Sequence, residues 1–277
     1  MNTAVAMCAA GLVVFLVGIP SIKREISKAR GLDTILALTN VSVAVPLAVF
    51  GALHLFGPQF VASIVPRYMP SRMFWVNLVG GGLLAASLSI ATNVAVRWSG
   101  LLFGIMMFLF VAMIHLPGAI AQPHNRIIWM VVFREMSFGG AGLILAGRAN
   151  VGQIFVTAAM LLFGVEHFLH PLGLPGVPLV RQMPAWVPAR QLVDYATGAV
   201  LLGGVVSVVF KRNTRLVLTC AGGWLLLLVL LIYGPVLIGA LSESSLPAQV
   251  ERVNYFADTL LFTGAILTLA RASSSRG

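Results

Sequence analysis

The sequence predicts an all-α fold, a polytopic transmembrane helical bundle, from its composition, its apolar runs and an internal repeat. Of its 277 residues, 59% are hydrophobic and 9% are charged, whereas a soluble domain carries roughly 25% charged residues. Several apolar runs reach about 20 residues, enough to cross a hydrocarbon core of ~30 Å. They do not alternate in polarity as the strands of a membrane barrel do. The composition therefore excludes a water-soluble fold.

The apolar runs and the residues that break them predict about nine spans. Their expected ranges are 2–19, 35–56, 74–94, 98–118, 128–147, 151–169, 192–210, 216–240 and 253–270. The first run has its basic residues after it rather than before it, the reverse of a cleavable signal peptide. We therefore expect it to remain as an N-terminal anchor.

The distribution of basic residues predicts a multi-pass protein of the cell (inner) membrane with its N-terminus outside and its C-terminus in the cytoplasm. Eleven basic residues fall on the predicted cytoplasmic side: Lys23, Arg24, Lys28, Arg30, Arg97, Arg148, Lys211, Arg212, Arg215, Arg271 and Arg276. Six fall on the outer side: Arg67, Arg72, Arg126, Arg181, Arg190 and Arg252. The net charge of +10 is spread over short loops, which disfavours nucleic-acid binding and indicates the lipid bilayer as the partner.

An internal repeat appears when the chain is aligned with itself. Phe50, Gly51, His54 and Pro58 recur 113 residues later, as Phe163, Gly164, His167 and Pro171. Pro66, Pro70, Arg72, Gly80, Arg97 and Pro117 recur 118 residues later, as Pro184, Pro188, Arg190, Gly198, Arg215 and Pro235. The five extra residues of the second copy fall within 172–181, in an outer loop. Four spans per repeat return the chain to the same side, so the two repeats should be similarly oriented.

The repeat predicts three parts: an N-terminal helix with a basic cytoplasmic loop (1–34), a first four-helix repeat (35–150) and a second one (151–277). The outer segment 57–73 is too apolar for a free loop and too rich in proline for a span. We expect it to fold as a small cap over the outer mouth of the bundle. The glycine runs Gly80–Gly82 and Gly203–Gly204 predict close helix contacts.

These motifs resemble those of the DoxX-like family of four-helix membrane proteins. The resemblance rests on an apolar span with Phe-Gly and His, the segments Ile64–Pro70 and Met183–Pro188, and the Gly-rich closing helices at Phe138–Ala146 and Phe262–Leu267. It covers residues 40–272 as two tandem units. The family includes a subunit of an archaeal thiosulfate:quinone oxidoreductase, so the resemblance implies a membrane subunit of a quinone- or sulfur-linked redox system, with a redox partner subunit.

Ionisable residues inside a bilayer are costly and are therefore candidate functional residues. Glu166 and His170 are four residues apart and share a helix face, and His167 and His170 have a spacing that suits a metal or a haem propionate. The duplicated pair His54 and His167 suggests a haem held between the repeats. The alternative is structural, with each ring bonded to a backbone carbonyl or to a carboxylate. Cys8 and Cys220 have no metal-ligand or redox spacing, and no metal site is predicted.

His115 and its repeat counterpart Tyr233 each precede a proline, which we expect to end the helix. Two hydrogen-bonding rings in an apolar slot suit a quinone carbonyl, and the alternative is anchoring at the membrane interface. Arg134 is expected to pair with Glu166 or Asp194, or else to reach the surface. Together the sequence predicts a polar cluster near the outer leaflet, formed by His54, His115, Arg134, Glu135, Glu166, His167, His170 and Asp258.

No residue set meets the geometry of a known reaction class, so the sequence does not identify an enzyme. Three functions remain open. The first is a redox membrane subunit with a small-molecule site. The second is a transporter or permease that uses the seam between the repeats. The third is a non-catalytic assembly protein whose cap docks a partner.

Overall fold

The computed structural model describes residues 2–273, and these residues form helices and connecting turns. The helices are α1 (Thr3–Ile26), α2 (Asp33–Leu36), α3 (Thr39–Phe56), α4 (Pro58–Ala62), α5 (Arg72–Thr92), α6 (Val96–Phe110), α7 (Leu116–Ala121), α8 (Arg126–Leu145), α9 (Ala149–Leu169), α10 (Arg190–Val209), α11 (Thr214–Leu228), α12 (Gly234–Ala240) and α13 (Leu246–Ser273). The π-helical turns η1 (Val111–His115) and η2 (Val229–Tyr233) join α6 to α7 and α11 to α12.

Nine helical stretches within residues 2–273 are long and apolar enough to cross a membrane, which confirms the predicted all-α membrane fold. Two predicted ends were wrong. The first span continues through Pro20 to Ile26, because Lys23 and its polar neighbours need only leave the hydrocarbon, not the helix. The last helix begins at Leu246 rather than near 253, because Glu251 and Arg252 are paired by Arg181 and Glu243. Arg276 and the C-terminal Gly277 lie outside the described residues.

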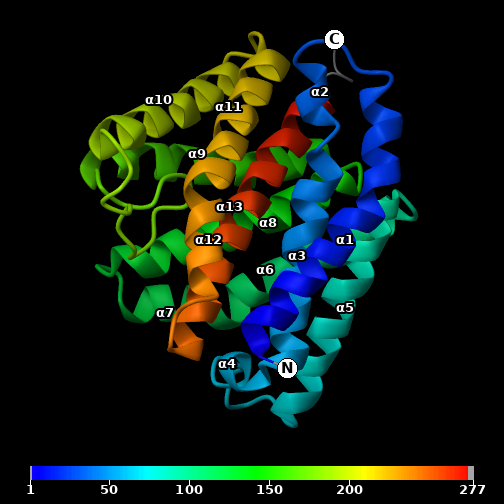
Figure 1. Ribbon diagram of the computed structural model, residues 1–277, viewed down its shortest axis with the longest axis vertical. Coiled ribbons are helices and arrows are strands. Elements are labelled where there is room, and N and C mark those ends of the chain that lie inside the picture. The colour runs from blue at the N-terminus through cyan, green and yellow to red at the C-terminus, as the bar shows by residue number, and fades with distance from the viewer. Residues whose placement is uncertain (1, 274–277) are drawn as a thin grey trace.

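The eight long helices of the two repeats contact one another in a closed ring. Its order is α3, α5, α6, α8, α9, α10, α11, α13 and back to α3. The last helix of each repeat thus packs on the first helix of the other, while α8 and α13 also meet each other. Figure 1 shows α13 at the centre, with α1 outside the ring against α3 and α5. This reciprocal packing is the arrangement that a two-fold rotation of one repeat onto the other produces.

The 118-residue register of the repeat recurs in the backbone. Left-handed backbone conformations, which are uncommon for residues with a Cβ, occur in three pairs: Ser71 and Ala189, Asn93 and Lys211, and Ala95 and Asn213. The two π-helical turns also begin and end at positions 118 residues apart. The repeats therefore share local backbone geometry even where their side chains differ.

The π-helical turns have a common cause in sequence. Pro117 and Pro235 lack a backbone N–H, and a proline ring collides with the carbonyl four residues before it in an α-helix. The wider π turn relieves this collision, and the N–H of Leu116 and of Gly234 reaches back five residues to Val111 and Val229. The expectation that these prolines end their helices was therefore wrong, since α7 and α12 continue beyond them.

Two matched glycine pairs bring the first helices of each repeat together. A Cβ on Gly51 would lie 3.1 Å from the carbonyl oxygen of Gly80, and one on Gly164 would lie 3.3 Å from that of Gly198. Both distances are too short for an ordinary contact, so α3 meets α5, and α9 meets α10, through bare backbone. The predicted glycine runs contribute only in part: Gly80 and Gly204 are packed, whereas Gly81, Gly82 and Gly203 face open space.

The connections gather on two sides of the molecule. In Figure 1, α4 lies at the bottom, α7 at the lower left and the loop between α9 and α10 at the left, while α2 and the turn between α10 and α11 lie at the top. The first group matches the predicted outer segments and the second the predicted cytoplasmic ones. The assignment of these sides to the two faces of a membrane stays a prediction.

Candidate functional site

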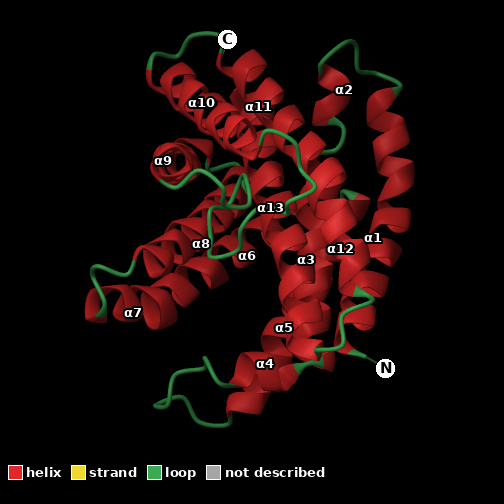
Figure 2. Ribbon diagram, turned by 60° about the vertical axis from the view of Figure 1, so that its left-hand side comes forward, coloured by secondary structure: helices red, strands yellow, loops and turns green. Residues whose placement is uncertain are grey.

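A cavity of about 920 Å³ lies between the helices of the first repeat on one side and α13 and Leu179 of the second repeat on the other. Because most of its lining residues belong to the first repeat, it is called the cavity of the first repeat. Its walls come from α3, α5, α6, η1, α8 and α13, and the segment after α4 covers it. Figure 2 shows α4, which contributes Phe60 and Val61 to the lining, at the bottom of the molecule below α3 and α5. Most of the lining is apolar, and it includes several aromatic and sulfur-containing side chains: Phe50, Trp75, Phe103, Met106, Met107, Phe110, Met113 and Phe138. The predicted cap over the first repeat is therefore present, and it encloses an apolar chamber.

A few polar groups converge on this chamber. His54 from α3 and His115 from η1 both line it, together with Arg134 and Glu135 of α8 and Asp258 of α13. The structure thus brings together five of the eight residues in the predicted polar cluster. A largely apolar cavity with a few convergent polar groups is the usual form of a small-molecule site.

Arg134 and its partners form the polar wall of the cavity. Arg134 Nη1 lies 2.7 Å from Asp258 Oδ2, and Nη2 lies 2.5 Å from Glu135 Oε1. The expected partners Glu166 and Asp194 were wrong. The closing-helix alignment of Phe138 with Phe262, an offset of 124 residues, makes Arg134 and Asp258 equivalent positions. They meet because α8 and α13, the equivalent helices, pack on each other.

The ring of His54 has one nitrogen engaged and one open. Nδ1 lies 2.7 Å from the carbonyl oxygen of Phe50, one helical turn earlier. A carbonyl only accepts, so Nδ1 carries the proton and Nε2 of the neutral ring is an acceptor. Neither Nε2 of His54 nor the ring of His115 has a hydrogen-bond partner among the described residues. Both rings can therefore bond to an occupant of the cavity.

Glu166 and His170 do not reach this cavity. Their shared helix face is confirmed, since Oε2 of Glu166 lies 2.9 Å from Nδ1 of His170. The same oxygen accepts from Nη1 of Arg126 at 2.7 Å. Arg126 and Glu166 therefore join α8 to α9 at the end of the bundle that the sequence predicts to be outer. At the equivalent contact between α13 and α3 the residues are Val250 and Leu53, both in one buried apolar cluster.

The corresponding space in the second repeat is filled by its own loop. The segment Leu174–Pro178 at the loop tip is entirely buried. Its base is closed by a short antiparallel bridge between Gly173 and Gln182. The backbone N–H of Leu172 donates to Asp194 Oδ2 at 2.6 Å, which also fixes the start of the loop. The five-residue insertion of this repeat therefore supplies the chain that enters the bundle.

The loop tip forms hydrogen bonds with His167 and Tyr233, the two rings of this repeat that the sequence assigned to a ligand. Nε2 of His167 accepts from the N–H of Gly176 at 2.9 Å, while its Nδ1 donates to Phe163 O at 2.5 Å. The hydroxyl of Tyr233 donates to Pro175 O at 2.7 Å. Both nitrogens of His167 are engaged by backbone, which agrees with the structural alternative for the histidine pair and leaves His167 no nitrogen for a haem or for a metal shared with His170. Tyr233 does bind a carbonyl, but one of its own chain.

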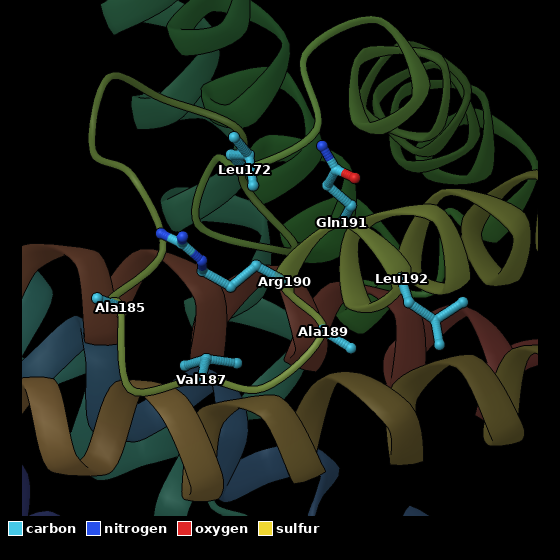
Figure 3. A pocket seen from close by; sticks show the side chains of 7 residues that line it. All are labelled: Leu172, Ala185, Val187, Ala189, Arg190, Gln191 and Leu192. Carbon is cyan, nitrogen blue, oxygen red and sulfur yellow. The ribbon is translucent and has the colours of Figure 1, made fainter.

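Asp194 stays inside the second repeat and away from the Arg134 network. Its Oδ1 lies 3.8 Å from Nε2 of His167, beyond hydrogen-bonding distance, and has no hydrogen-bond partner. A hollow of about 620 Å³ remains nearby, where the loop meets the start of α10. Figure 3 shows that it is bordered by loop residues and by Arg190, whose guanidinium points toward the loop. It lacks the buried polar groups of the first-repeat cavity.

Sequence reasoning missed several residues of the site. Asn254 lines the cavity with an unpartnered Oδ1, and Tyr255 on the same helix accepts from the N–H of Arg181. Arg126 was placed in a loop, although it pairs with Glu166. For the burial of the second-repeat loop, the sequence did contain a signal. Five extra residues in only one of two matched loops predict that the two loops occupy the bundle differently. Within residues 2–273 there is no group of three His, Cys, Asp or Glu side chains placed to hold a metal.

The comparisons with known proteins give no relative: no family model, no curated protein and no solved structure matches this chain. The membrane fold and the cavity of the first repeat therefore carry the functional argument.

Proposed function

We propose that this membrane protein binds a lipophilic small molecule in the cavity of the first repeat, near the outer end of the bundle. The observation that supports this proposal is an apolar cavity of about 920 Å³ whose polar groups include two ring side chains with open hydrogen-bonding positions. This volume falls in the range of about 300–1,000 Å³ that small-molecule sites occupy.

The rim of the cavity indicates how such a molecule enters. Leu78 on α5 and Leu109 on α6 border the cavity and have 54% and 51% of their surface exposed. Exposed apolar side chains on membrane-spanning helices face lipid. A lipophilic molecule can therefore pass from the bilayer into the chamber, with its polar group toward His54 and His115.

A quinone is the occupant that the resemblance to DoxX-like proteins implies, and it supports a role as a membrane subunit of a quinone- or sulfur-linked redox system. His115 can donate to a quinone carbonyl, and Nε2 of His54 can accept from a hydroquinone hydroxyl. The DoxX-like assignment and the redox role are part of this proposal.

The test is binding of a short-chain quinone to the purified protein in lipid nanodiscs, measured by equilibrium dialysis. Met106→Trp should weaken binding at least tenfold, because it fills the chamber with the residue found at the equivalent position 224. The matched control is Leu102→Trp, one turn earlier on α6, where the side chain is 64% exposed. Equal binding by the two variants would refute the site, and absence of binding to the unmodified protein would refute the quinone.

A further inference from the structure

The second repeat shows which chemical group the two ring positions hold. The carbonyl of Pro175 and the N–H of Gly176 belong to one peptide bond. Tyr233 donates to its oxygen at 2.7 Å and His167 accepts from its nitrogen at 2.9 Å. The amide is thus held by a donor at one ring position and an acceptor at the other.

The geometry of the clamp follows from the planarity of the amide. The described chain has no cis peptide bonds, so the N–H and C=O of this bond point to opposite sides. The rings of His167 on α9 and Tyr233 on η2 consequently approach the amide from opposite sides. A group with only an acceptor, such as an ester, satisfies one ring and leaves the other without a partner.

The first repeat keeps both ring positions, and no described residue forms a hydrogen bond with Nε2 of His54 or with the ring of His115. His54 is equivalent to His167, and its Nδ1 bonds to the carbonyl four residues earlier in the same way. The acceptor at Nε2 is therefore retained. His115 ends η1 as Tyr233 ends η2, and a neutral imidazole can donate as a phenol does. Both rings line the cavity, and the five extra residues of the second-repeat loop have no counterpart in the shorter segment that covers it.

The two repeats share the hydrophobic surroundings of this clamp. Leu225 contacts the position of Gly176 in the second repeat, and its equivalent Met107 lines the cavity of the first. Thr259 contacts the same glycine, and its equivalent is Glu135, at the polar wall. The open cavity thus has apolar walls like those around the buried loop tip, with a more polar end.

We infer that the cavity of the first repeat binds a lipophilic molecule through a secondary amide, with the amide N–H on His54 and the amide C=O on His115. The chemical class is an N-acyl amine or a related long-chain amide. This inference rests on the proposed lipophilic site and not on the quinone, and it assigns a secondary amide as the polar group that the two rings bind.

The experiment compares two probes of equal length on the unmodified protein in nanodiscs: N-hexyldecanamide and its ester counterpart, hexyl decanoate. The amide should bind about tenfold more tightly, because the ester leaves Nε2 of His54 unsatisfied in a buried site. Equal affinity for amide and ester would overturn the inference while leaving the lipophilic site intact. If neither these probes nor a short-chain quinone binds, the site proposed above fails as well.

Variants of His54 and His115 test which ring produces the preference for the amide over the ester. His115→Tyr copies the second repeat and should keep the preference for the amide, whereas His115→Phe should weaken binding of both probes by removing the donor to C=O. His54→Leu should abolish the difference between amide and ester. Thermal unfolding of each variant verifies folding, and the matched variant Tyr233→Phe should leave the amide preference unchanged. A preference that persists in His54→Leu would contradict the assignment.

Discussion

The two repeats carry ring side chains at the same two positions, but these side chains have different partners in each repeat. Both place a histidine at the end of the first helix and a ring at the end of a π-helical turn. In the second repeat these groups bond to the chain's own loop, and in the first they line a cavity. The difference shows that a loop longer by five residues fills with protein, in one repeat, the space that remains a cavity in the other.

The equivalent helices α8 and α13 show a second kind of divergence. Arg134 and Asp258 occupy equivalent positions and form an ion pair where the two helices meet. In a symmetric dimer two identical residues would meet at such a contact, and like charges would repel. A covalently joined pair of repeats can instead place opposite charges there, which links the two halves specifically.

The largest effect should come from breaking this link. Arg134→Leu leaves the buried carboxylates of Glu135 and Asp258 without their cation, and removing one partner of a buried ion pair costs about 3–5 kcal/mol. Chemical unfolding in detergent micelles measures the loss. The triple variant Arg134→Leu, Glu135→Gln, Asp258→Asn should regain most of it, and a single variant as stable as the unmodified protein would show that the pair does not hold the repeats together.

A smaller loss should follow from changing the loop tip. Gly176 has a φ of +106°, and a Cβ there would lie 3.0 Å from Thr259 Cγ2. Gly176→Ala should therefore destabilise the protein by about 2 kcal/mol through backbone strain. The control is Gly173→Ala in the same loop, where the nearest atom to an added Cβ is 3.8 Å away. If both variants unfold alike, the tip is not held in this conformation.

Removing the polar atoms of Tyr233 should lower the stability of the protein more than removing those of His115. Tyr233→Phe leaves the buried carbonyl of Pro175 unsatisfied and should cost about 1.5 kcal/mol. His115→Phe breaks no hydrogen bond within the described residues, so its effect on the ligand-free protein should stay within about 0.5 kcal/mol. Thermal unfolding of both variants tests the contrast. Equal losses would mean that the first-repeat ring is also held by the protein.

A weak coupling is expected at the contact between α8 and α9, at the end of the bundle that the sequence predicts to be outer. Arg126 and Glu166 form an ion pair between α8 and α9. At the equivalent contact between α13 and α3, the corresponding residues are Val250 and Leu53. A double-mutant cycle with Arg126→Val and Glu166→Leu should give a coupling of about 0.5–1 kcal/mol, because Arg126 is partly exposed and solvent weakens the attraction. The double variant should be about as stable as the unmodified protein. A coupling of zero would show that the pair contributes no stability.

The sequence by itself determined the class of the fold and its repeat. Apolar runs of about 20 residues define the spans because the hydrocarbon core demands internally bonded helices. The spacing of Gly51, Gly80 and Pro117 defines the repeat, because close helix contact and the missing N–H of proline act locally and leave the same mark in each copy. His54 and His115 also emerged as members of the candidate site from sequence alone.

Only the tertiary structure decided which polar groups meet. The partners of Arg134 depend on how α8 crosses α13, and a long side chain can reach several helices of similar depth, so sequence favoured Glu166 and Asp194 wrongly. Nε2 of His167 has a partner and Nε2 of His54 has none among the described residues, because the Gly- and Pro-rich loop of the second repeat folds into the bundle. The sequence did not reveal this, since such a loop can lie on the surface as readily as within the bundle. Its burial follows from the bonds it makes to His167, Asp194 and Tyr233, which residues distant in the chain supply.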